Sequence, residues 1–292
     1  MKKNLLLLIV TVTALCSAGT LHADGKIRVL LCDGPQKYHD YQKTTPVLKQ
    51  MLESTGRFEV TLSRSSKETT ADGSYKPEFS KYDVVVMNEG FGALTWPEET
   101  QKAFEAYMKN GGGLVSYHAA NNSWPGWTEY NKMTGIGGWA GRNEKSGPYL
   151  YMNDEGEVVR DTSPGKGGSH GPQHEYEVVV REKEHPIMKG LPPVFLHGPD
   201  ELYDRLRGPA ENVTILATAY SAKDKKGTGR HEPALMTIAY GEGRVFHTVL
   251  GHAVKHIKEG SFVTTFARGT EWAATGKVTI PVPRDFPNQK FD

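Results

Sequence analysis

The chain has 292 residues, of which 37% are hydrophobic and 24% are charged, a composition typical of soluble globular proteins. The formal net charge is only +1, so the sequence carries no electrostatic footprint for nucleic acid. The length allows one large domain or two small ones. We find no internal repeat and no low-complexity linker, which favours one domain.

Residues 1–23 have the pattern of a secretory signal peptide. Lys2 and Lys3 precede an apolar core, and Ala23 provides a small residue at the expected cleavage site. The apolar core is too short to span a bilayer. Cys16 could carry a lipid, but Leu15 before it stands where a lipoprotein signal needs a small residue. We therefore expect no stable membrane anchor. We therefore expect export to the periplasm or the extracellular space, with the signal peptide removed.

The mature chain, as predicted, consists of one domain over residues 24–280 and a proline-rich tail over 281–292. It keeps a single cysteine, Cys32, so no intramolecular disulfide can form. Cys32 lies in a predicted strand, where a cysteine usually acts as a small buried hydrophobe. Stability must come from the hydrophobic core, which a chain of this size can supply.

The first half of the chain alternates between apolar strands and amphipathic helices. Helix signals are Pro46, suited to a first turn, and the pair Thr95 and Glu98, which has capping-box spacing. Polar residues 65–80 read as a loop. The order β-α-β-β-α-β predicts an α/β fold with a mostly parallel sheet and helices on both faces. The predicted strands cover residues 27–32, 58–62, 82–87 and 114–117.

A long segment from about 121 to 174 shows no periodicity and predicts an inserted loop region. Segments of this kind inside a domain are usually lids or binding loops. Trp124, Trp127 and Trp139 fall within it, and aromatic rings among polar side chains suit the apolar faces of sugars. The alternative is that these rings anchor the loop to the body of the protein.

The second half of the chain reads mainly as strands followed by one helix. The residues between 184 and 192 are rich in turn formers. A glycine turn at 241–243 joins two apolar runs into a predicted hairpin. The predicted strands cover 175–181, 213–219, 234–240 and 245–250, and the predicted helix covers 262–274.

Two histidines stand where predicted strands end. His118 follows the strand at 114–117, and His252 follows the second strand of the hairpin. Ligands of open α/β sheets bind at the carboxyl ends of the strands, so both side chains are candidates for a functional site. The alternative for His118 is that it caps the strand by hydrogen bonding.

Several motifs together resemble the ThuA-like (trehalose utilisation) family. The first two motifs are Asn110-Gly-Gly-Gly-Leu-Val-Ser-Tyr-His118 and His185-Pro-Ile-Met-Lys-Gly-Leu-Pro192. Three more follow in the family's order, namely Asp200-Glu-Leu-Tyr203, the segment from Tyr240 to His252, and Arg268-Gly-Thr-Glu-Trp272. The resemblance covers roughly residues 27–275.

The resemblance implies a flavodoxin-like, class I glutamine amidotransferase-like fold. It also implies a role in the use of disaccharides, including oxidised 3-keto sugars, with a sugar dehydrogenase as pathway partner. The glutaminase relatives need a nucleophilic cysteine after the central strand, where this chain has Ser116-Tyr117-His118. Cysteine-thiolate chemistry is therefore excluded at this site, and we expect no glutamine hydrolysis.

The candidate catalytic residues are histidines and carboxylates at predicted loops and strand ends. Imidazole exchanges protons near neutral pH, and a nearby carboxylate can orient it. We predict His118 as the base with Glu89 or Asp200 as its partner, and His252 as a further catalytic group. The predicted substrate-binding residues are His39, Glu201 and the three tryptophans of the inserted loop.

A metal site is the competing use of the same side chains. His118, His170 and His174 are the candidate ligands for zinc or another divalent transition metal. Glycines and Pro172 forbid an ordinary helix around the last two, so the helical two-histidine spacing does not apply.

Two classes of function remain from the sequence. The first is a secreted enzyme that hydrolyses, eliminates or isomerises a small oxidised glycoside. The second is a non-catalytic sugar-binding or accessory protein of a sugar-utilisation pathway.

Overall fold

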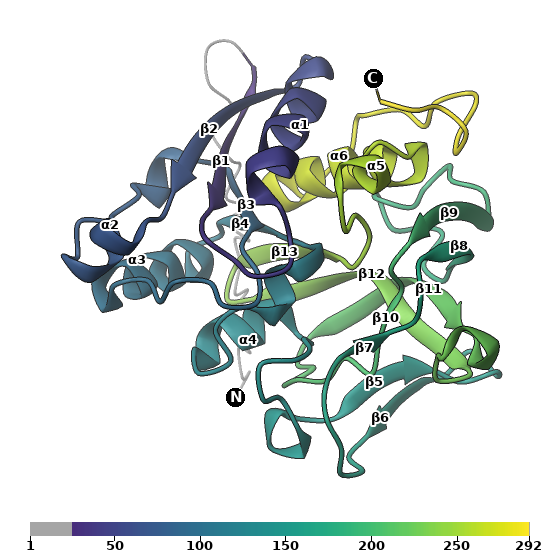
Figure 1. The fold of residues 1–292 in the computed structure, drawn as a ribbon. Coiled ribbons are helices and arrows are strands. Elements are labelled where there is room, and N and C mark those ends of the chain that lie inside the picture. The colour runs from purple at the N-terminus through teal and green to yellow at the C-terminus, as the bar shows by residue number, and fades with distance from the viewer. Residues whose placement is uncertain (1–24, 292) are drawn as a thin grey trace, which may run out of the picture.

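The computed structural model describes residues 25–291, so the predicted signal peptide lies outside the described residues. A large mixed sheet runs through the molecule, and helices cover both of its faces (Figure 1). The spatial order of the main strands is β2-β1-β3-β4-β13-β12-β11-β8-β9. The predicted α/β class with a mostly parallel sheet and helices on both faces is confirmed.

The parallel half of the sheet contains five strands. Neighbouring strands pair with matched registers, and residues such as Val86 and Val115 are fully buried. A strand that is buried on both faces needs this kind of unbroken apolar run. The five strands of the parallel half are β1 (Ile27–Asp33), β2 (Phe58–Arg64), β3 (Val84–Asn88), β4 (Gly113–Tyr117) and β13 (Gly243–Thr248).

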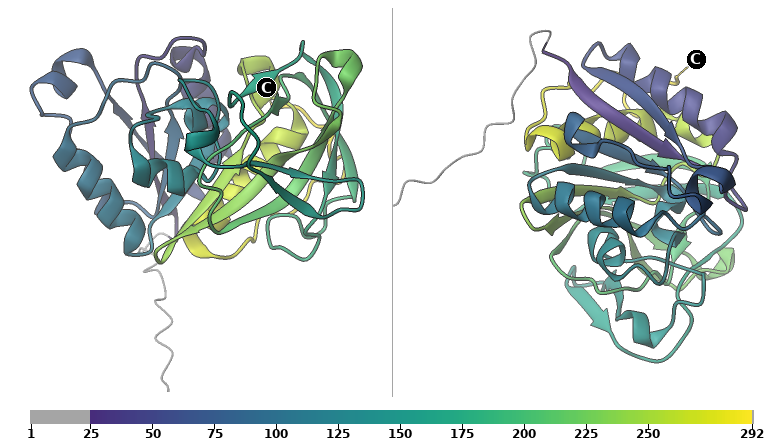
Figure 2. Two further views of the ribbon diagram at one scale, coloured as in Figure 1. Left: turned by 90° about the horizontal axis from the view of Figure 1, so that it is seen from below. Right: turned by 90° about the vertical axis from the view of Figure 1, so that its left-hand side faces the viewer.

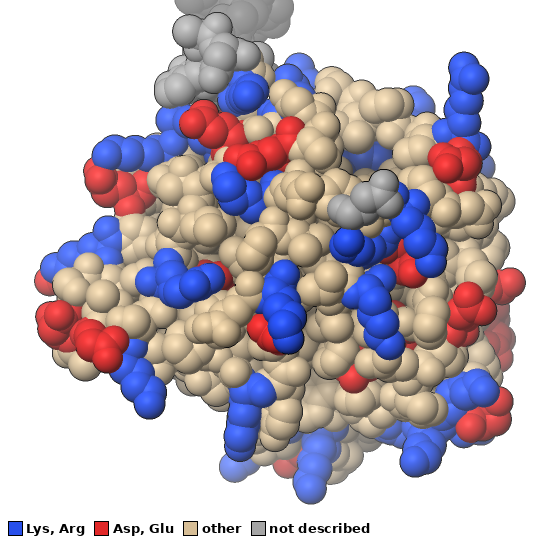
Figure 3. Space-filling model, turned by 45° about the horizontal axis from the view of Figure 1, so that its top comes forward, with Lys and Arg blue, Asp and Glu red and all other residues tan. Residues whose placement is uncertain are grey.

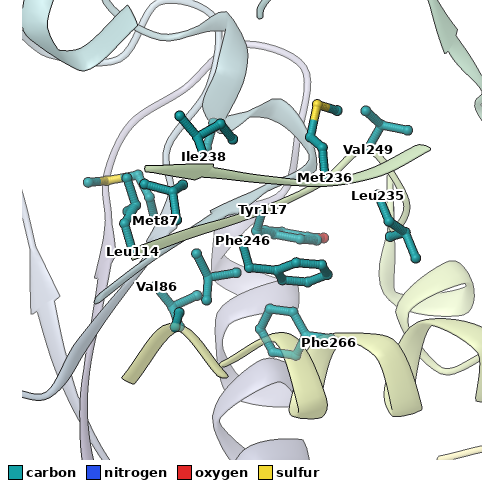
Figure 4. Packing of buried hydrophobic residues seen from close by; sticks show 14 of the residues in the cluster. Val86, Met87, Leu114, Tyr117, Leu235, Met236, Ile238, Phe246, Val249 and Phe266 are labelled. Atoms are coloured by element: carbon teal, nitrogen blue, oxygen red, sulfur yellow. The ribbon is translucent and has the colours of Figure 1, made fainter. Parts of the chain in front are cut away.

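Two layers of helices cover this half of the sheet. On one face lie α1 (Tyr41–Ser54), α5 (Val254–Ile257) and α6 (Gly260–Thr275). On the other lie α3 (Glu98–Lys109) and α4 (Thr128–Thr134), and Figure 2 shows the two layers from the side. Figure 4 shows Phe266 of α6 beneath Phe246, Val86 and Tyr117 of the sheet.

The antiparallel half continues the sheet beyond β13. It contains the predicted hairpin, in which β12 (Arg230–Tyr240) pairs antiparallel with β13. A smaller pair of strands, β5 and β6, attaches to β12. The remaining strands are β5 (Tyr149–Met152), β6 (Val158–Asp161), β7 (Ser169–His170), β8 (His174–Val180), β9 (Val194–Asp200), β10 (Tyr203–Asp204) and β11 (Val213–Ser221).

Two helix starts differ from the sequence prediction. Helix α1 begins five residues before Pro46, because the Asp40 side chain caps it by accepting from the Lys43 amide. Helix α3 begins after Pro97 and has no side-chain cap, so the predicted capping box at Thr95 does not form. Proline is favoured near helix starts because its φ angle is already helical.

Two segments that the sequence analysis treated as loops contain regular elements. The short helix α2 (Lys67–Ala71) forms within 65–80, and the 3₁₀ helix η1 (Phe79–Lys81) begins at the end of this range. Within 121–174, α4, β5, β6 and β7 form along with the 3₁₀ helix η3 (Glu144–Ser146). These elements are short, and periodicity identifies only longer segments. The fourth 3₁₀ helix, η4, covers Lys223–Lys225.

The molecular surface and the tail complete the architecture. Basic and acidic side chains are interspersed on the face seen in Figure 3. Residues 281–291 form no helix, and Phe286 of this segment packs on Phe195 with ring centroids 5.0 Å apart. Within residues 25–291, no helix is both long and apolar enough to cross a bilayer.

Candidate metal centre

His118 stands at the turn where the central strand β4 ends. It opens the 3₁₀ helix η2 (His118–Asn122) with a φ of 41°, in the left-handed region that non-glycine residues rarely adopt. Its Nδ1 lies 2.6 Å from the carbonyl oxygen of Val249, and its buried Nε2 has no hydrogen-bond partner. The chain thus holds a strained backbone to present one unpaired nitrogen, a feature that clusters at functional sites.

His252 reaches the same edge of the sheet from β13. Because β13 pairs in parallel with β4, the segments that follow these strands emerge side by side. Gly251, with φ 101°, turns the chain at this point, and the Tyr117 hydroxyl donates to its carbonyl oxygen. The ring of His252 lies 5.5 Å from that of His118.

Glu201 enters from the antiparallel half, directly after β9. Its Oε2 lies 3.1 Å from Nδ1 of His252. Burial opposes both charges, but the ion pair outweighs it, so the pKa of His252 is raised and that of Glu201 is lowered. Without a metal the two side chains therefore stabilise each other as a charged pair, and a metal bound by His252 would displace its proton.

His39 completes the group from the loop between β1 and α1. Its ring makes edge contacts with His118 and His252, with centroids 5.0 and 4.9 Å apart. Its Nε2 lies 3.3 Å from the Tyr203 hydroxyl, and its buried Nδ1 has no hydrogen-bond partner. One nitrogen thus faces a polar neighbour while the other stays free.

The four side chains form a candidate metal centre. One ligand atom from each of His39, His118, Glu201 and His252 lies within 4.8 Å of the others. Three imidazoles and a carboxylate suit zinc and other divalent transition metals. We call these four residues the histidine cluster.

The protonation of two imidazoles favours metal binding. Burial, with a further contribution from neighbouring histidines, lowers the pKa of His39 to about 4 and that of His118 well below its ordinary value. Both rings are therefore neutral near pH 7, as a metal requires. Nε2 of His39 faces the Tyr203 hydroxyl, and Nδ1 of His118 faces the carbonyl oxygen of Val249. Ligating histidines are usually oriented in this way, through the nitrogen that does not bind the metal.

Asp200 lies beneath the cluster and binds its backbone. Its carboxylate accepts from the amides of Glu201 at 2.8 Å, Gly251 at 2.6 Å and His252 at 3.3 Å. It also lies 2.9 Å from Nε2 of His197, whose Nδ1 is 2.7 Å from the Ser261 hydroxyl. Asp200 therefore joins the two loops that carry Glu201 and His252.

The predicted metal ligands His170 and His174 do not join the cluster. His170 pairs through β7 with Tyr203 of β10, and its Nε2 lies 3.8 Å from Oε2 of Glu201. His174 begins β8, and its Nδ1 lies 2.8 Å from the carbonyl oxygen of Pro172. Of the predicted ligand set, only His118 belongs to the cluster, because strand pairing places the other two rings beside it or away from it.

Glu89, a predicted partner of His118, lies elsewhere at the same sheet edge. It accepts a hydrogen bond from the Ser65 hydroxyl at 3.2 Å, and it is not among the four residues of the cluster. Burial raises its pKa to about 8, while the hydrogen bond from Ser65 opposes this shift. Glu89 is therefore mostly protonated near neutral pH.

The three tryptophans of the inserted segment separate into two places. Trp124 and Trp127 pack with Trp96 in one aromatic group, at centroid distances of 5.0 and 6.0 Å from it. Trp139 instead lies beside the histidine cluster, with its ring 4.7 Å from that of Tyr203. The first two tryptophans are thus anchored to the body of the protein.

Tyr203 is the site residue that the sequence analysis did not single out. Its ring lies 4.3 Å from that of His118, and its hydroxyl faces His39. The signal that could have identified it is its place in the motif Asp200-Glu-Leu-Tyr203. A cis peptide bond between Gly198 and Pro199 precedes this motif.

Comparisons with known proteins identify the family to which the chain belongs. The family model ThuA, described as trehalose utilisation, matches residues 28–273. A ThuA-like protein from Parabacteroides merdae is 47% identical, with a TM-score of 0.85 over 91% of this chain and 96% of that one. A ThuA-like protein from Bacteroides uniformis is 18% identical, with a TM-score of 0.57 over 87% and 93%, and it supports the fold alone. No curated protein is significantly similar.

Proposed function

Because this chain belongs to the ThuA (trehalose utilisation) family, and so has a carbohydrate-related role, we propose that it is a metal-dependent enzyme acting on an oxidised disaccharide or glycoside. The single observation that carries the proposal is the convergence of His39, His118, His252 and Glu201 within 4.8 Å. Export to the periplasm or the extracellular space remains part of the proposal.

The three histidines would hold the metal, which leaves the carboxylate for proton transfer. Catalytic zinc sites commonly have three protein ligands and one position open to water or substrate. A metal held there would polarise the keto oxygen of the sugar and stabilise negative charge on it. His39, Glu201 and His252 are partly exposed, so a sugar would approach the cluster from their side.

Glu201 is the proposed proton carrier. Removal of the proton next to a keto group, followed by departure of the glycosidic oxygen, needs a base and then an acid. Oε2 of Glu201 faces His252 on one side and the half-exposed His170 on the other, at 3.1 and 3.8 Å. His170 would therefore pass the proton between Glu201 and solvent through one water molecule. Here Glu201 takes the role of base that the sequence analysis had given to His118.

The first test is proton NMR of a 3-keto disaccharide incubated with the purified protein, before and after treatment with EDTA. We expect conversion, its loss with EDTA and its recovery when Zn²⁺ is added. An unchanged spectrum with broadened ligand lines would overturn the enzymatic proposal in favour of a sugar-binding protein. Conversion that continues after EDTA treatment would overturn the proposed dependence on a metal.

Matched variants test the assignment of residues. His118→Ala should lose most of the bound metal, measured by elemental analysis, and most of the activity. His174→Ala is the control, because this partly exposed histidine lies outside the cluster and the variant should keep both. Glu201→Gln should keep metal but lose turnover by about 10²–10⁴-fold. Full activity in His118→Ala would contradict the proposed site.

A further inference from the structure

A cavity lies near the histidine cluster. It has a volume of about 440 Å³ and opens between the loop that follows β3 and the segment that follows η2. This volume lies in the range of about 300 to 1,000 Å³ that is typical of small-molecule sites. The side chains that give its walls their character are Phe91, Trp124, Trp127, Thr95, Gln101 and Asn122.

The walls of the cavity continue into the cluster. Asn122, at the end of η2, lies against the phenol of Tyr203, whose ring is 4.3 Å from that of His118. Ala140 lines the cavity next to Trp139, and the ring of Trp139 packs on Tyr203. The side chains of Asn122 and Tyr203 therefore lie between the cavity and His118.

A third wall leads to the cluster through the loop of His39. Phe91 lines the cavity, and its carbonyl oxygen accepts from the Lys37 amide at 2.9 Å, two residues before His39. Tyr38 packs on Phe91 with ring centroids 5.6 Å apart and is 66% exposed. This exposed ring extends the aromatic wall toward solvent.

The chemistry of the lining fits an uncharged, hydroxylated ring. The indole N–H groups of Trp124 and Trp127 are already bound, to Leu94 O at 2.9 Å and Glu105 Oε1 at 2.8 Å, so these side chains offer apolar surface. Asn122 Oδ1 is buried and accepts no hydrogen bond. No charged side chain is among the lining residues, all of which belong to the described part of the chain. Such a lining disfavours phosphorylated or acidic ligands, because it offers them no counter-charge.

We infer that this cavity is a saccharide subsite. Of the two sugar rings of a disaccharide, one reacts at the histidine cluster, and the cavity binds the other. The apolar faces of the aromatic rings cover the C–H face of the sugar, and the amides of Asn122 and Gln101 serve its hydroxyl groups. The position of the reacting ring rests on the proposed function, whereas binding in the cavity does not.

Gly126 provides a direct test, because it lines the cavity without a conformational need for glycine. A Cβ atom built there meets nothing within 4 Å, and its φ lies outside the left-handed region. Gly126→Leu therefore adds a large side chain at the rim of the cavity with no steric conflict at its Cβ atom. Gly126→Ala is the matched control, since it makes the same backbone change but adds only a methyl group.

The measurement is isothermal titration of the EDTA-treated protein with trehalose and with glucose. We expect trehalose to bind, and Gly126→Leu to weaken that binding at least about tenfold while Gly126→Ala changes it less than about threefold. Zn²⁺ binding should be equal in both variants, because the cluster is untouched. Trehalose binding that is equal in Gly126→Leu and the wild-type protein would overturn the subsite.

The outcomes separate this inference from the proposed function. Trehalose binding that Gly126→Leu weakens, in a protein that converts no keto disaccharide, would keep the subsite and end the enzymatic proposal. Conversion of a keto disaccharide with a KM unchanged in Gly126→Leu would end the subsite and keep the enzyme. An absence of trehalose binding to the wild-type protein would also count against the subsite.

Discussion

Two buried carboxylates at the same edge of the sheet differ in charge. Asp200 and Glu89 are both 0% exposed, so access to solvent does not distinguish them. Burial acts to raise the pKa of each. For Asp200 the hydrogen bond and charge of His197 outweigh burial and hold the pKa well below its ordinary value, whereas the pKa of Glu89 rises to about 8.

The polar and charged partners of the two carboxylates explain the difference. Asp200 receives three backbone amides in addition to His197. Glu89 receives the Ser65 hydroxyl, and its Oε2 accepts no hydrogen bond. The Trp96 indole also approaches Glu89 and lowers its pKa, but without the geometry of a full hydrogen bond. Depth of burial therefore does not decide whether a carboxylate is charged, because the donors around it do.

The largest expected effect comes from removing the charged partner. Asp200→Ala leaves three backbone amides and His197 without their acceptor, so we expect a loss of about 3–5 kcal/mol in the free energy of unfolding. Urea denaturation measures it. Asp200→Asn keeps the shape but not the charge, and it should lose less. A loss below about 1 kcal/mol in Asp200→Ala would mean that the network does not hold the two loops.

The second effect is a pH dependence caused by Glu89. Its pKa is higher in the folded protein than the ordinary value of 4.5, so between about pH 4.5 and about 8 the unfolded chain loses this proton while the folded chain keeps it. Stability from this group is therefore full below pH 4.5 and falls as the pH rises toward 8, by up to about 1.4 kcal/mol per pH unit.

Glu89→Gln isolates that contribution. Glutamine does not titrate, so the variant should lack this part of the slope, while its carboxamide oxygen can still accept from Ser65. Urea denaturation of both proteins at pH 5, 6, 7 and 8 measures the difference. Parallel curves for the variant and the wild-type protein would show that Glu89 is ionised in the folded state.

The third effect tests the far end of the Asp200 network. The Ser261 hydroxyl lies 2.7 Å from Nδ1 of His197, opposite the nitrogen that contacts Asp200. Ser261→Ala should cost about 1–2 kcal/mol, because it leaves a buried ring nitrogen unpaired. Metal binding at the cluster should survive, since the contacts of Asp200 to the loops remain. Metal loss in this variant would show that orientation of His197 is needed for the site.

The sequence predicted the parallel half of the fold better than the antiparallel half. Strands β1, β3 and β4 are buried on both faces and show apolar runs, and α3 and α6 carry a helical period. By contrast, β9 contains Gly198 and Pro199, and no strand is predicted over its residues. Such short or irregular strands form because a neighbouring strand pairs with them, and the local pattern does not record that partner.

The site followed the same division. The strand-end rule singled out His118 and His252, since both follow parallel strands. It could not show that Glu201 from β9 and His39 from the first loop meet them, because those contacts join residues that are far apart in the sequence. Nor could it separate Asp200 from Glu89, whose charge states depend on burial and on side chains brought together by the fold, such as His197 and Ser65.

The smallest expected effect sharpens the contrast from the side of Glu89. The Ser65 hydroxyl donates to Oε1 and thereby favours the ionised carboxylate, so Ser65→Ala should raise the pKa of Glu89 further. The free-energy cost of the substitution should be about 0.5–1.5 kcal/mol at pH 6 and larger at pH 9, where the wild-type carboxylate is charged.

Ser66→Ala is the matched control for this last variant. Ser66 caps α2 by accepting from the Thr69 amide, so its loss should cost about 1 kcal/mol equally at both pH values. Urea denaturation gives the free-energy cost of each substitution at both pH values. The informative quantity is the cost of Ser65→Ala minus that of Ser66→Ala, taken at pH 9 and compared with its value at pH 6. If the two values are equal, the hydroxyl of Ser65 does not bias the charge of Glu89. The contrast would then lie in the partners of Asp200 alone, His197 first among them.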